Sequence, residues 1–169
     1  YRYSYALDNS AFPYSNKSDR FLVSRILKLF AYLIPYCQPD LVVIACNTAS
    51  TLVLDPLRQH FNLPFVGVVP AIKPAAAASK SRVIGLLATE ATVSREYIQQ
   101  LHAAHAEHCE MICLGSQRLV EIAENKMLGK TVNINDILQE LEKLQQHSLH
   151  DAIDVFILGC THFPAIRSE

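Results

Sequence analysis

A chain of 169 residues, half of them hydrophobic, is long enough to bury a substantial core in one ordinary domain or in two small ones. Its 15 basic and 16 acidic residues give a formal charge of −1, so it lacks the electrostatic footprint of a protein that binds nucleic acid or an anionic membrane surface. Proline, aspartate or lysine interrupts the longest apolar stretches well before the roughly 20 residues that a membrane-spanning helix needs. We therefore expect a soluble globular protein without a membrane segment.

The cysteines form an odd set without Cys-x-x-Cys spacing, which favours free thiols in a reducing compartment and hence a cytoplasmic protein. They are Cys37, Cys46, Cys109, Cys113 and Cys160. The chain opens at Tyr1 directly in a strand-like alternation, without an initiator methionine. We expect it to be a fragment of a longer protein.

Predicted strands and helices alternate along the first part of the chain. We expect strands at 1–7, 40–45 and 63–69, a loop at 8–18, and helices at 19–36 and 50–61. Thr48 or Ser50 is expected to cap the second helix by accepting a hydrogen bond from its free amides.

The same alternation continues in the second part. Residues 70–81 contain Pro70, Pro74 and an alanine run, which suit a helix start and a connection between two lobes. Beyond this boundary we expect strands at 82–88, 109–114 and 153–158, and helices at 92–105, 117–125 and 135–146. The pattern predicts an α/β fold with mainly parallel sheets flanked by helices.

Two similar cysteine segments carry the clearest functional signal. Cys46 and Cys160 each follow a short apolar run, at 40–44 and 154–158, which is typical of a strand buried on both faces of a parallel sheet. Ligands of such sheets bind outside the carboxyl ends of the strands, so the two thiols are expected to face one pocket. A helix start after each strand would add backbone amides that stabilise a thiolate and bind a carboxylate. This arrangement predicts two-sided acid/base chemistry.

The same residues allow three other interpretations. Each cysteine could be a small buried hydrophobe, although the repetition of the motif argues against that for the pair. Cys46, Cys160 and His162 could be zinc ligands, but no fourth ligand is apparent. Cys160 with His162 could form the nucleophile and base of a hydrolase, which leaves the Cys46 segment unexplained.

Four segments together resemble the glutamate racemases, a family of the aspartate/glutamate racemase superfamily. They are residues 8–14, 45–50, 88–93 and 159–164, and they occur in the family's order over nearly the whole chain. The resemblance implies two similar α/β lobes with the active site between them. Residues 1–70 would form a partial first lobe carrying Cys46, 71–164 a second lobe carrying Cys160, and 165–169 the start of the return to the first lobe. The family's N-terminal Asp-Ser-Gly strand and its C-terminal segment are absent, so the first lobe is expected to be incomplete.

The resemblance also implies roles for individual residues. Cys46 and Cys160 would be the catalytic thiols, the first deprotonating D-glutamate and the second L-glutamate, with His162 tuning Cys160. The family's assisting glutamate would be Glu124, which we favour over Glu121. Substrate contacts would come from Pro13, Tyr14, Ser15, Asn47, Thr48, Thr92, Thr161 and His162. Ser15 replaces the family's glycine, and a serine would be strained there if the position needs a positive φ.

The implied activity is the cofactor-independent racemisation of L-glutamate to D-glutamate for peptidoglycan precursor synthesis, with neither a cofactor nor a metal. Residues 114–117 are similar to a proteobacterial subgroup, some members of which are activated by UDP-N-acetylmuramoyl-alanine. The alternatives are a racemase acting on aspartate or a hydantoin, and a fragment that only binds glutamate or a partner protein. A homodimer is left open.

Overall fold

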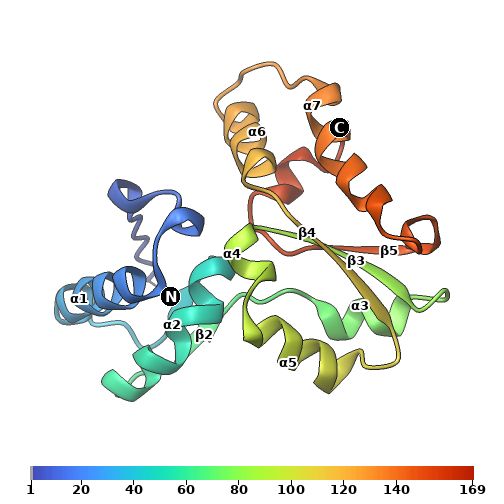
Figure 1. Cartoon of the computed structure of the whole chain (residues 1–169). Coiled ribbons are helices and arrows are strands. Elements are labelled where there is room, and N and C mark those ends of the chain that lie inside the picture. Colours follow the sequence, from blue (N-terminus) through green and yellow to red (C-terminus); the bar gives the residue numbers. More distant parts are fainter. Residues whose placement is uncertain (1) are drawn as a thin grey trace. The chain divides into compact units, whose positions relative to one another are not determined.

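The chain alternates parallel strands and helices in two compact units, Tyr1–Val68 and Val69–Glu169 (Figure 1). The computed structural model describes residues 2–169. Within these described residues both units hold only parallel strand pairs, which confirms the predicted α/β class. Within residues 2–169, each helix is too short or too polar to cross a bilayer.

The first unit is a β–α–β arrangement with an additional helix packed on it. Its elements are the 3₁₀ turns η1 (Asn9–Ala11) and η2 (Tyr14–Asn16), α1 (Asp19–Cys37), β1 (Val42–Ile44), α2 (Asn47–His60) and β2 (Phe65–Gly67). β1 and β2 pair in parallel, with Ile44 opposite Gly67 at their carboxyl ends. The residues after both strands therefore leave the sheet at the same edge.

The core of this unit lies on one face of the two-stranded sheet. Ile26 of α1 and Val53 and Leu57 of α2 pack with Ile44 and Phe65. On the opposite face Val43 is 55% exposed and Val66 47% exposed. The prediction that the 40–44 strand is buried on both faces is therefore wrong, because the helices of this core pack on the Ile44 face of the sheet.

The strand predicted at residues 1–7 is also wrong for residues 2–7, which have no regular secondary structure. Tyr3 and Tyr5 are 89% and 88% exposed. An alternating pattern forms a strand only where a neighbour supplies ladder hydrogen bonds, and β1 and β2 pair only with each other in the described part of the chain.

The second unit is built around β3, the central strand of a three-stranded parallel sheet of order β4-β3-β5. Its elements are α3 (Ile72–Ala78), β3 (Val83–Ala88), α4 (Glu90–Val93), α5 (Glu96–His105), β4 (Glu110–Gly115), α6 (Gln117–Met127), α7 (Ile134–Glu142), η3 (Lys143–Gln146), η4 (His150–Ala152), β5 (Val155–Leu158) and η5 (Phe163–Ile166). α3 and α5 lie on one side of this sheet, and α6 and α7 on the other (Figure 1).

Alternation along β3 produces these two layers. Ile84, Leu86 and Ala88 pack into the core formed with α3 and α5, whereas Val83 and Leu87 pack on the side of α6, α7 and η3. Because successive side chains of a strand point to opposite faces, a run that is apolar throughout serves both cores.

One helix predicted at 92–105 is in fact two, α4 and α5. Thr89 caps α4 by accepting a hydrogen bond from the Thr92 amide at 3.3 Å, and Arg95 returns to extended backbone before α5 begins. The break falls at Ser94 and Arg95, directly after Val93, and valine and serine are residue types that give a helix little intrinsic support. Likewise, the helix predicted at 135–146 is α-helical only to Glu142 and continues as the 3₁₀ helix η3.

Candidate functional site

A cysteine, a histidine and a glutamate lie together in the second unit. His162 Nδ1 is 3.6 Å from the Cys160 sulfur, and His162 Nε2 is 2.7 Å from Glu124 Oε1. Cys160 is 6% exposed, so its sulfur is shielded while the imidazole is partly open. The structure thus brings together three of the four predicted catalytic residues within one unit.

Helix α6 aims Glu124 at this histidine. Its buried residues Leu119, Val120 and Ala123 pack in the same core as Cys160. Glu124 pairs with His162, whereas Glu121 is exposed and pairs with Arg118 at 3.3 Å. The structure thus places Glu124, which the sequence analysis favours over Glu121, beside His162.

Gly159 allows Cys160 to sit tightly under the central strand. A Cβ at this position would lie 2.8 Å from Leu86 Cδ1 and 3.2 Å from the Leu87 carbonyl oxygen. The Gly159 amide donates to that same carbonyl at 2.7 Å. The close backbone approach therefore requires glycine at this point of the motif.

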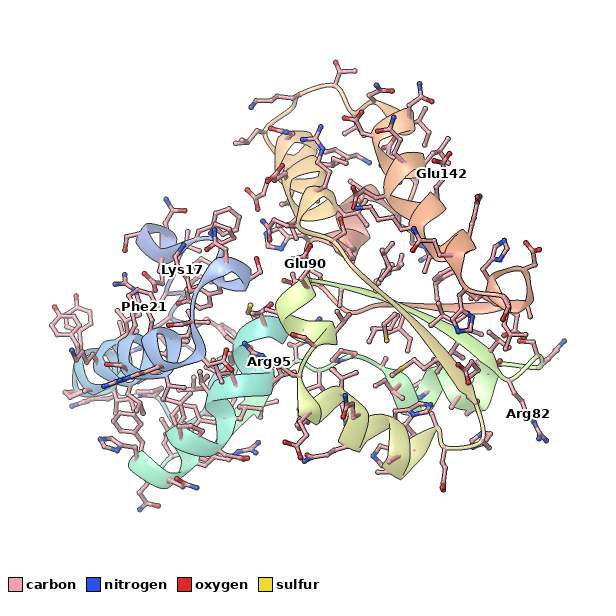
Figure 2. All side chains as sticks on the ribbon, viewed as in Figure 1. Lys17, Phe21, Arg82, Glu90, Arg95 and Glu142 are labelled. Carbon is pink, nitrogen blue, oxygen red and sulfur yellow. The ribbon has the colours of Figure 1, made fainter. Side chains whose placement is uncertain are left out.

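The polar residues at the sheet edge beside Cys160 differ in their exposure to solvent. Strands β3 and β5 end beside each other, with Leu87 paired to Leu158, so Thr89 and Gly159 leave the sheet at one edge. Thr92 is fully buried, with its hydroxyl 2.9 Å from that of Thr89, while Thr161 is exposed. Glu90 lies at the start of α4, as Figure 2 shows.

Sequence reasoning missed a second polar link at this edge. The Ser116 hydroxyl donates to Glu140 Oε2 at 2.7 Å and accepts from the Leu119 amide at 3.0 Å, so Ser116 both caps α6 and ties it to α7. Burial alone would raise the pKa of Glu140, but hydrogen bonds from Lys143 and Ser116 lower it below its ordinary value. A serine before a helix is a recognisable cap, whereas its partner 24 residues later gives no local signal.

In the first unit, Cys46 occupies the N-cap position of α2 with extended backbone. The predicted cap residues Thr48 and Ser50 instead lie inside the helix, because it begins at Asn47. Ser50 donates to the Ile44 carbonyl and accepts from the Val68 amide, both at 3.0 Å, and so joins α2 to β1 and to the end of β2. Of the two cysteines, Cys46 alone directly precedes an α-helix, since only the four-residue 3₁₀ helix η5 follows Cys160.

Asn47 supplies an unused acceptor beside Cys46. The residue is 4% exposed, and its Oδ1 has no hydrogen-bond partner within residues 2–169. Buried polar atoms are nearly always paired, so an orphaned acceptor indicates a place where a ligand donor can bind. The neighbouring Thr48 is also 4% exposed.

The predicted substrate loop at Pro13, Tyr14 and Ser15 is tied down by two residues for which no role was predicted. The Tyr14 hydroxyl donates to Asp8 Oδ2 at 2.7 Å, and Arg25 binds the same carboxylate with two hydrogen bonds. Ser15 lies in η2 without a positive φ, so the strain considered for it is absent. Asp8 belongs to one of the motifs, but the sequence contained no signal for its pairing with Arg25.

This network shifts the ionisation of two groups. The hydrogen bonds from Arg25 hold the pKa of Asp8 at about 2, and the Tyr14 hydroxyl contributes in the same direction. Burial raises the pKa of Tyr14, and the charge of Asp8 raises it further. Asp8 is therefore an anion and Tyr14 a neutral donor at physiological pH.

Among residues 2–169 there is no group of three histidine, cysteine, aspartate or glutamate side chains that could hold a metal ion. The Cys160 and His162 geometry could also serve a thiol nucleophile, the hydrolase alternative, but that scheme gives no use to the Cys46 segment.

Cys46 and Cys160 thus each follow the carboxyl end of a strand in a parallel sheet. The chain belongs to the Asp/Glu/Hydantoin racemase family, whose model matches residues 5–169. This confirms the family predicted from the four motifs.

Relatives of known name agree with this assignment. The chain is 50% identical over 167 residues to the glutamate racemase of Pasteurella multocida and 47% identical to that of Pectobacterium carotovorum, covering 99% of this chain in each case. It spans 61% and 58% of the lengths of these two relatives.

Solved structures show the same fold. The glutamate racemase of Escherichia coli, in complex with L-glutamate and the activator UDP-MurNAc-ala, superposes with a TM-score of 0.88 at 42% identity, over 96% of this chain and 60% of that one. The RacE1 isoform of Bacillus anthracis gives a TM-score of 0.79 at 27% identity, over 95% of this chain and 59% of that one.

Proposed function

We propose that this chain carries both thiols of a glutamate racemase, which interconverts L- and D-glutamate without a cofactor and supplies D-glutamate for peptidoglycan precursors. The observation that carries the proposal is the Cys160, His162 and Glu124 arrangement in a chain whose relatives are named glutamate racemases. Inverting a carbon centre requires a base on one face and an acid on the other, which two separate thiols can provide.

Glu124 and His162 prepare Cys160 for its role. A carboxylate only accepts hydrogen bonds, so the Glu124 contact places a hydrogen on His162 Nε2. In the neutral imidazole, Nδ1 then carries the lone pair that takes the proton of the Cys160 thiol, and the protonated Nδ1 afterwards donates a hydrogen bond to the thiolate. The resulting thiolate removes the Cα proton of L-glutamate.

Cys46 completes the inversion. As Cys160 takes the proton from one face of Cα, the Cys46 thiol gives its proton to the opposite face, and D-glutamate leaves with Cys46 as thiolate and Cys160 as thiol. The N-terminal amides of α2 favour a negative charge at Cys46. The reverse reaction starts with Cys46 as the base, and the proposal requires both thiols to reach one Cα.

Substrate binding is assigned to the polar groups beside the thiols. The orphaned Oδ1 of Asn47 is suited to accept from the α-ammonium group. Thr48, Thr161 and Thr92 are proposed to contact the carboxylates, and hydrogen bonds to the α-carboxylate would stabilise the carbanion. The tethered Tyr14 loop, with Pro13 and Ser15, would frame the side-chain pocket.

Deuterium exchange tests this function. The protein encoded by the complete open reading frame that contains this chain is incubated with D- or L-glutamate in D₂O. Loss of the Cα proton is followed by NMR, and optical inversion is measured alongside. We expect exchange and inversion of both enantiomers without added cofactor. Cys46→Ser and Cys160→Ser should each abolish inversion, whereas Cys113→Ser, which changes an exposed thiol outside both motifs, should not.

The same assay distinguishes the alternatives. Inversion of aspartate or a hydantoin in place of glutamate would move the substrate within the superfamily. Glutamate binding without any Cα exchange would reduce the protein to a binding module, and inversion that survives both cysteine substitutions would overturn the two-thiol mechanism.

Three further properties are proposed with this function. The E. coli relative was solved with UDP-MurNAc-ala as its activator, and we propose that the same compound raises kcat here. We also propose a homodimer, which light scattering after gel filtration tests. Five free cysteines among the described residues support a location in the reducing cytoplasm, tested by fractionation.

A further inference from the structure

A bidentate ion pair between Arg25 and Asp8 anchors the N-terminal loop of the first unit. Arg25 Nε is 2.6 Å from Asp8 Oδ2, and its Nη2 is 2.5 Å from Asp8 Oδ1 and 2.5 Å from the Ser10 hydroxyl. The Asp8 side chain is only 12% exposed. Bidentate geometry of this kind fixes orientation as well as distance.

Helix α1 holds Arg25 rigidly. Leu22 and Ile26, its neighbours on the helix, are buried, and the guanidinium lies 6.0 Å from the centre of the Phe21 ring. Phe21 is seen on the blue helix in Figure 2. Arg25 is thus fixed on α1, and its guanidinium holds the carboxylate of Asp8.

Tyr14 connects the Arg25–Asp8 pair to the surroundings of Cys46. Its hydroxyl donates to the oxygen of Asp8 that also accepts from Arg25 Nε, and η2, which begins with Tyr14, packs against α2. Tyr14 and Cys46 pack against the same core cluster, and a charge on Cys46 would contribute to the raised pKa of Tyr14. The tyrosine is therefore within electrostatic reach of the thiol.

We propose that Arg25 and Asp8 are positioning residues, which hold Tyr14 beside Cys46 and so set the shape of the substrate pocket and the access to that thiol. The claim about the shape of the substrate pocket rests on the proposed function, whereas the claim about access to Cys46 is independent of it. Because the pair joins the loop to α1 with fixed geometry, we expect its consequence for the pocket to be local order of the loop.

Alkylation of Cys46 tests the proposal without any catalytic readout. The complete protein is treated with iodoacetamide, and modification of the peptides containing Cys46 and Cys160 is followed by mass spectrometry. Arg25→Met should raise the rate at Cys46 about fivefold, because the untethered loop opens more often, and leave Cys160 unchanged. Tyr14→Phe, which keeps the ring and removes only the tether, should act in the same direction.

Arg118→Met is the matched control. Arg118 is likewise a helix arginine paired with carboxylates, Glu121 at 3.3 Å and Asp136 at 2.9 Å, but it lies in the second unit. It should alter neither rate. Equal acceleration at Cys46 in this control, or an unchanged rate at Cys46 in folded Arg25→Met and Tyr14→Phe, would overturn the proposal.

Steady-state kinetics then test the pocket. Arg25→Met and Asp8→Asn should each raise KM for glutamate about tenfold with a smaller change in kcat. The double variant should have the same KM as either single variant, because both substitutions remove the same ion pair. Arg25→Lys, which cannot bind both oxygens, should restore part of the loss. Additive effects would overturn the shared link, whereas absence of racemisation in the unmodified protein would refute the proposed function and leave the alkylation result standing.

Discussion

Glu124 and His162 are joined through Oε1 and Nε2 at 2.7 Å, which leaves the other ring nitrogen of His162 facing the Cys160 sulfur at 3.6 Å. The pair links α6 to the turn after β5, two elements brought together by the core that they share. A carboxylate that accepts a hydrogen bond from an imidazole fixes the imidazole's tautomer, so in the proposed reaction Glu124 would leave His162 Nδ1 to accept the Cys160 proton.

Glu124→Gln should therefore impair one of the two proton transfers. Because the equilibrium constant of a racemase is unity, kcat/KM must fall equally in both directions, and we expect a loss of about 10 to 100-fold. The asymmetry should appear in primary isotope effects, which should grow for L-glutamate deuterated at Cα and shrink for D-glutamate, since transfer at Cys160 becomes slower. Glu121→Gln is the matched control, and equal isotope effects in the Glu124 variant would contradict the assignment.

Asn47→Leu should separate binding from stability. The substitution removes a buried acceptor that has no partner in the described residues, so the Tm should not fall, while KM for glutamate should rise at least about tenfold through loss of the ammonium contact. The measurements are thermal unfolding and initial rates, with the exposed Asn62→Leu as control. A lower Tm together with an unchanged KM would show that Asn47 serves the fold instead.

Asp8 should make the protein sensitive to acid. Its pKa of about 2 lies below the ordinary value of 3.8, so its contribution is complete above about pH 4 and is lost as the pH falls toward 2. We expect the free energy of unfolding of the wild type to exceed that of Asp8→Asn by about 2 kcal/mol at pH 6, and this difference to shrink on acidification. Urea unfolding at several pH values measures it, and a difference independent of pH would refute the linkage.

Ser116→Ala should loosen the start of α6. It removes the cap of the Leu119 amide and the hydrogen bond to Glu140 at a position that is 1% exposed, at a cost of about 1 to 2 kcal/mol. Urea unfolding of this variant is compared with that of Ser94→Ala, which changes an exposed serine. Equal stability of the two variants would mean that the cap contributes nothing.

Local patterns predicted most of the elements because apolar period and capping residues act within a few positions. The strands of the second unit and helix α1 follow directly from such patterns, and the motif around Cys160 and His162 predicted a contact that the structure contains. Glu124 is favoured over Glu121 only through the resemblance, because the partners of the two side chains depend on how α6 packs against the turn after β5.

What could not be predicted depends on partners distant in the chain. Arg25 meets Asp8 across 17 positions, and the outward face of Val43 follows from where the helices pack rather than from the apolar run itself. Residues 2–7 alternate like a strand but pair with no other strand of the described chain. Pattern alone gives a segment's preference, and a neighbour decides whether that preference is realised.

The outward-facing Val43 and Val66 have a practical consequence. They sit side by side in register on a two-stranded sheet, each about half exposed. Apolar side chains on a short parallel sheet form a template on which other chains can associate. A preparation of this chain should therefore lose monomer as its concentration rises, and Val43→Lys should slow that loss without touching either cysteine motif.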